Sequence, residues 1–574
     1  MKTKLLLSTL FASFLLTSNL SAQNPTFEWA KQMGGTSSAT GTAMAMDSSG
    51  SIYIIGNFYQ TVDFDPSAGT FNLTSNGESD IFITKLDAQG NFLWAKQIGG
   101  TSIDYPGNIA VDANGNVLVG GSFRGTVDLN PGAGEQTVTE PGQEAFLLKL
   151  NSDGDFMWAK HWGGNSNSTT NNIHSIAFDS SGNIIIGGSF EGTNDLNPGA
   201  GTFNVTPIGS GDAYILKLDA SGGFLWAKAF GGDLIYSRDA VTTLAVDGSD
   251  NIVASGNFYG TYTPFDLQGS GSFYIKLDAS GNLIWSKQTS AASGEVNTRS
   301  LKLDKQGNAY IVGRFGGTRD FDPGVGVFNL TCSSGYYDIF ILKLDASGNF
   351  VWAKGFGGSA SLGGDSGNSI VLDNQGYLYT TGTYVGQGDF DPGDGKFILP
   401  AVGRIDMFIL KLDTDGNFVY ANSFGATPDG YSGETVGNSL IADASGNIFC
   451  TGSFQNTTDF NPGSGVFNLV SNGRDDIFIL KLSYTATVGI PQNTFTENIQ
   501  VYPNPTTGNF AIKFETIQND LSIRIISISG QTIETKTFQN TDFVQLKLEQ
   551  PNGIYIVDVL NEKRKRAEFR LIKK

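Results

Sequence analysis

The chain has 574 residues, a formal net charge of −19 at pH 7 and a pI near 4.5. This acidity argues against nucleic acid or an anionic membrane surface as a partner, because both are polyanions. Two cysteines, Cys332 and Cys450, are too few for a disulfide framework, and we expect buried free thiols.

The first 22 residues have the pattern of a secretory signal. Lys2 and Lys4 precede an apolar stretch, Leu5–Leu16, and cleavage is expected between Ala22 and Gln23. The apolar stretch is too short to span a bilayer, and no other segment is apolar enough to do so. A buried N-terminal helix is the alternative. The sequence therefore predicts export from the cytoplasm and no transmembrane segment.

A motif recurs along most of the chain, and Asp87–Gly100 (DAQGNFLWAKQIGG) is a clear copy of it. Its aromatic positions follow one another with a period of about 65 residues, which indicates a tandem repeat of supersecondary units. The aromatic anchors are Trp29, Trp94, Trp158, Trp226, Trp285, Trp352 and Tyr420.

Each repeat contains four short apolar stretches of strand length, bounded by Gly, Asn, Asp and Pro. Tight Asp-x-x-Gly turns, such as Asp112–Gly115 and Asp345–Gly348, connect two of the pairs. Asp caps the backbone amides of such a turn, and Gly accepts the positive φ that follows. Four antiparallel strands per repeat are typical of a β-propeller blade.

The order of the strands predicts how the array closes. It opens with a lone fourth strand, Thr26–Lys31, and it ends after a third strand, Asp476–Leu482. Pairing of these two would complete the last blade and leave no open sheet edge. We therefore expect an all-β fold, with a seven-bladed β-propeller over residues 23–483 closed by the N-terminal strand. A linear β-solenoid is the alternative. The repeat resembles the bacterial propeller repeats of secreted proteins (SBBP-type repeats) over about residues 26–483.

The long connections between second and third strands share the motif Asp-[Phe/Leu]-[Asp/Asn]-Pro-x-x-Gly. Carboxylates two residues apart suit calcium, whereas the Pro and Gly equally suit a rigid structural turn, and both interpretations stay open. The fourth blade lacks the motif. Calcium is the one cofactor considered, and its candidate ligands are Asp63, Asp65, Asp128, Asn130, Asp195, Asn197, Asp320, Asp322, Asp389, Asp391, Asp459 and Asn461.

No catalytic motif stands out, and we expect no enzyme activity. The only two histidines, His161 and His174, leave little room for His-based metal sites or Ser-His-Asp triads. The Gly-Gly pairs that follow the fourth strands are interpreted as turn glycines. The remaining enzymatic alternative is a carboxylate pair in a carbohydrate-active site. Its candidates are the non-repeating acids Asp104, Asp233, Asp239, Asp365 and Glu434.

The period ends at a polar linker, residues 484–496, and residues 497–574 contain seven short strand candidates. They predict a small Ig-like β-sandwich. Its sequence features are Tyr502, Pro503, Asn504, Pro505, Gly508, Gly553 and Tyr555.

This tail resembles the C-terminal sorting domain of type IX secretion substrates in Bacteroidetes. The resemblance implies export across the outer membrane by the type IX machinery and removal of the tail by a sortase-like peptidase. The protein would then be released or attached at the cell surface. Variable loops on a rigid scaffold commonly bind ligands. We therefore expect a binding or adhesion module for a glycan or protein ligand, and a structural surface-layer component is a further alternative.

Overall fold

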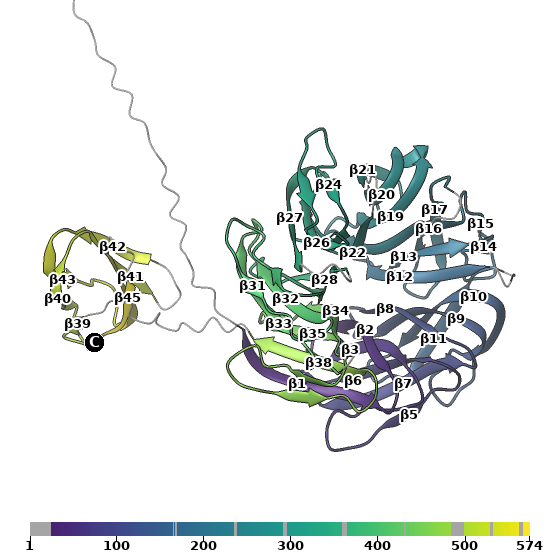
Figure 1. Cartoon of the computed structure of the whole chain (residues 1–574), viewed down its shortest axis with the longest axis horizontal. Coiled ribbons are helices and arrows are strands. Elements are labelled where there is room, and N and C mark those ends of the chain that lie inside the picture. The colour runs from purple at the N-terminus through teal and green to yellow at the C-terminus, as the bar shows by residue number, and fades with distance from the viewer. Residues whose placement is uncertain are drawn as a thin grey trace, which may run out of the picture. The chain divides into compact units, whose positions relative to one another are not determined.

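The computed structural model describes residues 25–164, 166, 169–234, 238–290, 295–333, 335–358, 364–429, 432–483, 499–527, 532–561 and 566–574. The predicted signal, its cleavage position at Ala22–Gln23 and the predicted linker 484–496 lie outside these residues. Strands dominate the described part, which contains one 3-10 turn, η1 (Thr263–Phe265), and no α-helix (Figure 1). The all-β prediction is confirmed. The chain divides into two compact units, Met1–Thr485 and Ala486–Lys574.

Antiparallel pairing groups the long strands of the larger unit into seven sets of four, named A to D across each sheet. Set 1 contains β2 (Ala39–Met46), β3 (Ile52–Phe58), β6 (Asp80–Leu86) and β7 (Phe92–Gly100). Set 2 contains β8 (Tyr105–Val111), β9 (Val117–Asp128), β10 (Thr137–Leu150) and β11 (Phe156–Trp162). Set 3 contains β12 (Thr170–Phe178), β13 (Ile184–Glu191), β16 (Gly211–Leu218) and β17 (Phe224–Phe230).

The later sets follow the same order. Set 4 contains β18 (Ala240–Val246), β19 (Ile252–Tyr262), β20 (Leu267–Leu277) and β21 (Leu283–Ser290). Set 5 contains β22 (Val296–Leu303), β23 (Ala309–Phe315), β26 (Asp338–Leu344) and β27 (Phe350–Gly358). Set 6 contains β28 (Ser366–Leu372), β29 (Leu378–Tyr384), β32 (Asp406–Leu412) and β33 (Phe418–Phe424). Set 7 contains β34 (Thr435–Ala442), β35 (Ile448–Phe454), β38 (Asp476–Ser483) and β1 (Thr26–Gly35).

Five of the B–C connections form small hairpins of their own. They are β4 (Thr61–Asp63) with β5 (Asn72–Thr74), β14 (Asn194–Asp195) with β15 (Asn204–Val205), β24 (Thr318–Asp320) with β25 (Asn329–Thr331), β30 (Gly388–Asp389) with β31 (Ile398–Leu399), and β36 (Thr457–Asp459) with β37 (Asn468–Val470). In sets 2 and 4 the B and C strands themselves extend into the hairpin.

The A strands contact one another in sequence, and β34 of set 7 contacts β2 of set 1 (Figure 1). The first strand, β1, pairs with β38 from Thr26 to Met33, as the sequence predicts. The sets stay in separate sheets or are joined by short bridges, and no sheet closes on itself.

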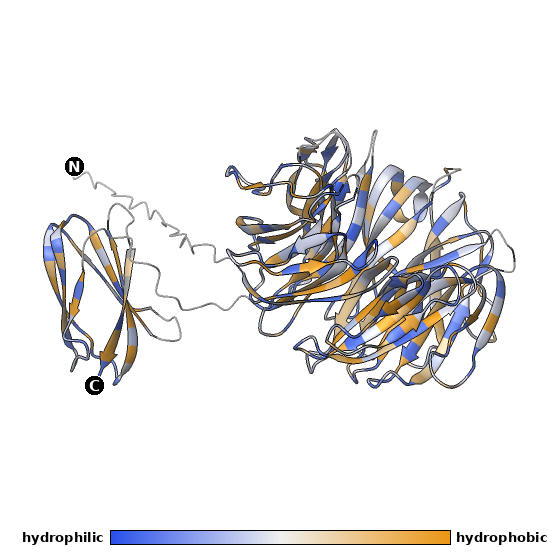
Figure 2. Ribbon diagram, turned by 60° about the horizontal axis from the view of Figure 1, so that its bottom comes forward, coloured by the Kyte–Doolittle hydropathy of each residue, from blue (hydrophilic) through white to orange (hydrophobic). Residues whose placement is uncertain are grey.

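Packing between neighbouring sets supplies the core, because the B and C strands are buried on both faces. Six of the seven residues of β3 and all seven of β6 are buried. The cluster around Ile54 and Phe82 of set 1 also contains Phe449, Ile477 and Ile479 of set 7, so the last set packs on the first. Figure 2 shows apolar residues within the strands of both units.

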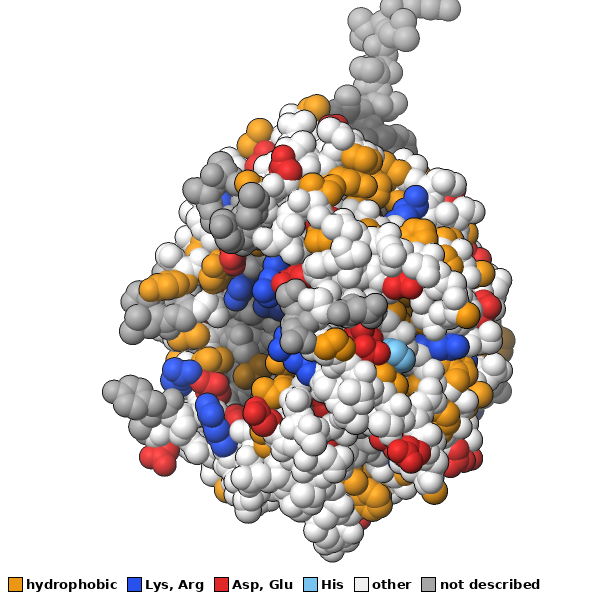
Figure 3. Space-filling model, turned by 90° about the vertical axis from the view of Figure 1, so that its right-hand side faces the viewer, with side chains coloured by type: hydrophobic (Ala, Val, Ile, Leu, Met, Phe, Trp, Pro, Cys, Tyr) orange, Lys and Arg blue, Asp and Glu red, His pale blue; other side chains and the backbone are white. Residues whose placement is uncertain are grey.

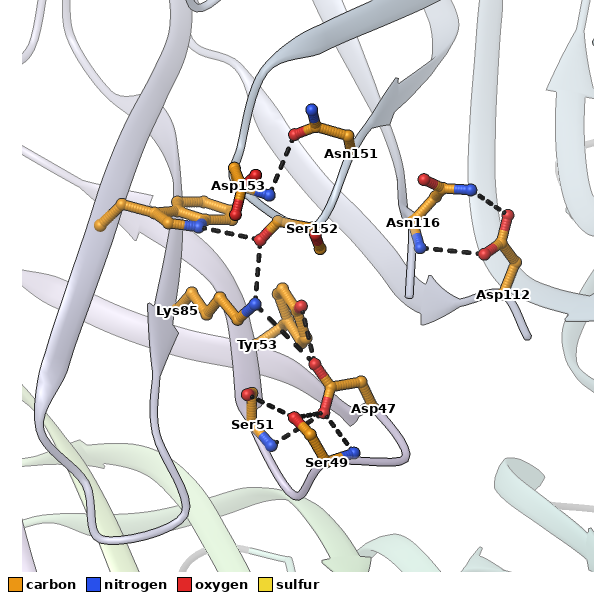
Figure 4. A network of polar contacts seen from close by, with 11 residues as sticks. Asp47, Ser49, Ser51, Tyr53, Lys85, Asp112, Asn116, Asn151, Ser152 and Asp153 are labelled. Atoms are coloured by element: carbon orange, nitrogen blue, oxygen red, sulfur yellow. Dashed lines mark hydrogen bonds and ion pairs between the residues drawn. The ribbon is translucent and has the colours of Figure 1, made fainter. Parts of the chain in front are cut away.

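The Asp-x-x-Gly turns cap themselves and also join one set to the next (Figure 4). Asp47 Oδ1 accepts the N–H groups of Ser49 and Ser51 at 2.9 and 3.0 Å. Across the set boundary, Lys85 Nζ and Trp94 Nε1 donate to the Ser152 carbonyl at 2.9 and 3.3 Å. The repeated Trp is therefore an anchor to the next set.

The same lysine contact links the last set to the first. Lys481 Nζ on β38 donates to the carbonyl of Ala88, in the C–D turn of set 1, at 3.4 Å. This bond and the β1–β38 pairing connect set 7 to both ends of the repeat array.

The pair Gly99–Gly100 corrects one prediction. Gly99 and Gly100 lie inside β7 and pair with Asp128 and Val127 of set 2, so they are not turn glycines. A Cβ on Gly100 would stand 2.0 Å from the Thr126 carbonyl oxygen, and one on Gly99 would stand 2.1 Å from Asp80 Cγ. Glycine is required here because the backbone of the next set approaches closely.

The smaller unit has two antiparallel sheets over one core, the arrangement of a sandwich. One sheet is β39 (Gln500–Tyr502), β40 (Asn509–Gln518) and β43 (Thr541–Lys547). The other is β42 (Thr532–Phe538), β41 (Leu521–Ser527), β44 (Gly553–Asn561) and β45 (Arg566–Lys573). Ile512 and Phe514 of the first sheet share a buried cluster with Ile523, Val557 and Val559 of the second.

Candidate functional site

A cavity of about 920 Å³ lies at the centre of the seven A strands, and residues of all seven line it. This volume is within the usual range for ligand sites, about 300–1,000 Å³. A smaller cavity of about 220 Å³ shares His174 with it and is also lined by Arg238, Glu191 and Asp239. The A strands therefore enclose a concave site that no single repeat could form.

Every A strand carries a β-bulge at the same place in its pairing with strand B. A bulge leaves one residue out of the ladder and redirects its side chain. The seven bulged residues all line the central cavity, and they are Thr42, Gly107, His174, Thr242, Arg299, Asn368 and Asn438.

Some bulged residues tie neighbouring sets together. Asn368 Nδ2 donates to the Gly437 carbonyl at 3.0 Å, and Asn438 Nδ2 donates to the Gly41 carbonyl at 2.9 Å. The second bond joins set 7 to set 1. His174 Nε2 lies 3.0 Å from Ser189 Oγ. The ring of bulges thus has both structural members and members with spare hydrogen-bonding capacity.

The ionisable groups that line the cavity are all basic: His174, Arg299 and Lys302. Burial and the nearby Arg299 guanidinium lower the pKa of His174 to about 4, so His174 is neutral at pH 7. Both cations are exposed to the cavity, where desolvation lowers the pKa of Lys302, and desolvation together with Arg314 lowers that of Arg299. The cavity is therefore cationic inside a chain of net charge −19.

The two cations depart from the repeat. By pairing register, Lys302 stands where the other A strands have small or branched apolar residues. These are Ala45, Ala110, Ala177, Ala245, Val371 and Ile441. Within the described residues, neither Arg299 nor Lys302 makes a hydrogen bond or ion pair with protein. Their charges are left uncompensated by direct contacts.

The end of the sets where B strands finish and C strands begin, with the D–A connections, is called here the loop face. All seven arginines of residues 1–485 lie towards this end. They are Arg124, Arg238, Arg299, Arg314, Arg319, Arg404 and Arg474. Figure 3 shows a face of the molecule where Lys and Arg side chains gather around a hollow. Several of these seven arginines pair with acids, such as Arg238 with Glu191 at 2.7 Å and Arg404 with Glu434.

The non-repeating acids considered as catalytic candidates bind backbone. Asp104 accepts the Gly100 N–H at 2.8 Å, and Asp239 accepts those of Gly232 and Tyr259 at 2.6 and 2.7 Å. Asp365 accepts the N–H groups of Gly358 and Val385, and Asp233 accepts that of Thr261. Glu434 instead pairs with the Arg404 side chain.

Three of these carboxyls have strongly raised pKa values. Burial raises the pKa of Asp104, Asp239 and Asp365 to about 7 in each case. A second carboxylate adds to the effect: Asp80 for Asp104, Asp212 for Asp239 and Asp338 for Asp365. Each acid pair closes a loop onto the end of a D strand.

The candidate calcium loops use their carboxylate oxygens within the turn. Asp63 Oδ1 accepts the N–H groups of Asp65 and Phe71 at 3.0 and 2.8 Å. Asp65 Oδ1 accepts the Ser67 N–H at 2.9 Å. Asp128, Asp195, Asp320, Asp389 and Asp459 repeat the first pattern, and Asn130, Asn197, Asp322, Asp391 and Asn461 the second. The turn interpretation accounts for these bonds, and calcium binding stays a prediction.

A group of ligand-type residues that the sequence analysis missed lies in set 2. Ligand atoms of Glu140, Glu144 and His161 lie within 4.8 Å of one another, and His161 Nδ1 is 3.1 Å from Glu144 Oε2. In set 1 the equivalent of the His–Glu pair is Gln97 Nε2, which donates to Asp80 at 2.6 Å. The His–Glu contact therefore replaces a structural bond of the repeat.

The Tyr502–Pro505 segment of the smaller unit is tied to the last strand. Asn504 Nδ2 donates to the Arg570 carbonyl at 2.5 Å, and the Ile572 N–H donates to Asn504 Oδ1 at 2.9 Å. Gly508, with φ of 125°, donates its N–H to Thr506 Oγ1 at 3.0 Å. Tyr555 Oη donates to the Pro551 carbonyl at 2.7 Å.

Neither cysteine forms a disulfide in the described structure. Cys450 is buried on β35 and Cys332 is half-buried.

Two protein-family models match the chain. Residues 500–574 match a model described as a secretion system C-terminal sorting domain, and residues 93–122 match one described as a beta-propeller repeat. Both suspected resemblances are confirmed. The sorting domain indicates type IX export to the cell surface or the extracellular space. None of the described residues forms a helix with the length and apolarity of a membrane crossing.

Similar individual proteins are distant. An uncharacterized WD repeat-containing protein of Acanthamoeba polyphaga mimivirus is 24% identical over 68% of this chain and 34% of its own length. An endo-acting ulvan lyase of Formosa agariphila is 23% identical over 41% of this chain and 44% of its own. A solved structure of unknown function from Dyadobacter fermentans is 11% identical, with a TM-score of 0.34, over 66% of this chain and 94% of that one. The chain thus spans less than half of the two curated relatives.

Proposed function

We propose that residues 23–483 form a closed seven-bladed β-propeller that binds a glycan or protein ligand through its central cavity and loop face. The seven four-stranded sets, the contact of β34 with β2 and the Lys481–Ala88 bond support the closed ring. The sorting domain delivers the propeller to the cell surface, where it stays attached as a binding or adhesion module.

One observation carries the binding function. In a ring built from repeats, the cavity gathers three basic side chains that break the repeat, namely His174, Arg299 and Lys302. Repeat positions that serve stability keep one residue type from set to set, as the lysines at the ends of the C strands do. Residues that differ from the other repeats and line a cavity of about 920 Å³ are consistent with recognition of a ligand.

We propose no catalytic role. The bonds of Asp104, Asp239 and Asp365 to loop backbone support this, because acids held inside loops lack the freedom of a general acid and base pair.

A glycan array tests the proposal. The full chain without residues 1–22 is screened with calcium and again with a chelator. If one glycan binds selectively and Arg299→Asn changes that binding, the result supports the cavity as the binding site. Chromatography of the incubated glycan checks that its length is unchanged. A blank array in both conditions, together with an empty pull-down from the cell-surface fraction, would remove the binding function. Shortening of the glycan would instead establish an enzyme.

A further inference from the structure

We propose that the central cavity takes an acidic saccharide, whose carboxylate or sulfate group binds between Arg299 and Lys302. The inference rests on the proposed binding function and names its ligand class. Both cations lie on β22, three residues apart, and both line the cavity.

The first argument is the uncompensated charge. Both side chains are exposed to the cavity, and neither has a hydrogen bond or ion pair among the described residues, so both cations are available to contact a ligand. Glu295, which directly precedes β22, attracts Arg299 without forming an ion pair with it, and no acid acts on Lys302. An oxyanion in the cavity would supply the missing partner.

The second argument is the pattern across the ring. A surface lysine is ordinary, but Lys302 interrupts a level that six A strands fill with Ala, Val or Ile. Arg299 similarly replaces Asn, Thr, His or Gly at the bulge. One set alone provides both changes, and both side chains line the same space.

The third argument concerns the neutral part of the ligand. Asn257, on β19, lines the cavity, and its Oδ1 is buried without a hydrogen-bond partner in the described structure. Strand β19 contacts β22, so this acceptor lies on the element next to the two cations. Hydroxyl groups of Thr42, Thr242, Ser300, Ser369 and Ser439 line the rest. An unpaired acceptor beside cations suits a ligand that carries hydroxyl donors as well as an anion, as an acidic sugar does.

The test compares a matched pair of ligands. Tetragalacturonate and its fully methyl-esterified form have the same backbone and differ in charge, and a tetramer of sulfated galactose with its unsulfated form makes a second pair. Binding to the full chain without residues 1–22 is measured by calorimetry at low ionic strength. Inorganic sulfate and a poly-glutamate peptide are the remaining probes.

The variants restore residues that the ring already uses. Arg299→Asn copies Asn368 and Asn438, and Lys302→Ala copies Ala45 and Ala245, so both are expected to fold. Lys305→Ala removes the same charge from an exposed position of the next turn and is the control. Loss of one charge-assisted contact corresponds to about a 10-fold weaker affinity.

We expect at least one acidic tetramer to bind, about 10-fold more weakly in each cavity variant and unchanged in Lys305→Ala. Binding that the cavity variants leave unaltered would overturn the assignment. Tighter binding of the neutral tetramers would also overturn it, because the protein would then bind saccharides without requiring an acidic group. Sulfate or poly-glutamate binding without any tetramer would overturn the saccharide. If no probe binds and the glycan array is also blank, both proposals fall.

Discussion

Lys217 offers a direct measure of how a set is held together and joined to the next set, because it pairs with Asp179 of its own set and bonds to the next set. Lys217 Nζ lies 2.8 Å from Asp179 Oδ2, and the two side chains are 6% and 3% exposed. The same ammonium donates to the Ala279 carbonyl of the next set at 3.1 Å. Lys217→Met keeps the apolar stem but leaves a buried carboxylate without its cation.

The expected cost is about 3 kcal/mol. Removing one partner of a buried pair costs about 3–5 kcal/mol. The lower end applies because Asp179 keeps bonds from the N–H groups of Ser181 and Asn183 and from Asn183 Nδ2. The double variant Lys217→Met/Asp179→Asn should recover much of the loss, since Asn151 already makes the same turn bonds in set 2.

Urea denaturation followed by tryptophan fluorescence measures the effect in the larger unit alone, because all seven tryptophans lie in residues 1–485. Lys396→Met, at an exposed loop position, is the control and should change the midpoint little. Equal losses in the single and double variants would refute the charge argument and assign the loss to the Ala279 contact. A single variant as stable as the parent would refute the role of the link altogether.

Other consequences follow from the same structure. The raised pKa values of Asp104, Asp239 and Asp365, about 7 each, mean that the folded state binds more protons than the unfolded state from about pH 4 to pH 7. Stability should therefore fall as pH rises through this window, by up to about 1.4 kcal/mol per pH unit per group. In the variant with all three residues changed to Asn, the urea midpoint should depend less on pH. Deleting Thr26–Gly35 should expose β38 and lower the melting temperature markedly in calorimetry; an unchanged melt would contradict ring closure. If the B–C turns bind calcium, a chelator should lower the melting temperature, and no shift would leave them as turns. Deleting residues 497–574 should retain the chain in the periplasm in cell fractionation, and surface display would contradict the sorting role.

The sequence was sufficient for features that depend on neighbours along the chain. The Asp-x-x-Gly turns, the repeated Trp and the pairing of Thr26–Lys31 with Asp476–Leu482 each follow from local chemistry or from strand order. The role of Gly99–Gly100 depends on a backbone about 27 residues further on, in another set, and local reasoning took these residues for a turn. The cavity residues emerge only when equivalent positions of the seven A strands are compared with one another. Alignment of the A strands would have revealed Lys302 as the exception among Ala, Val and Ile.

Residues for stability and residues for recognition lie on different strands of the same sets, the former on the C strands and the latter on the A strands. Lysines of the C strands, such as Lys149 and Lys217, are paired with acids of their own sets at 2.9 and 2.8 Å, and they also donate to carbonyls of the next set. Lys302, on an A strand, has no such partner among the described residues, and its side chain is exposed. We therefore expect Lys302→Ala to leave the urea midpoint of the ligand-free chain nearly unchanged while weakening the binding of acidic ligands. A variant that lost stability would show that Lys302 serves the ring, and the separation of the two roles would fail.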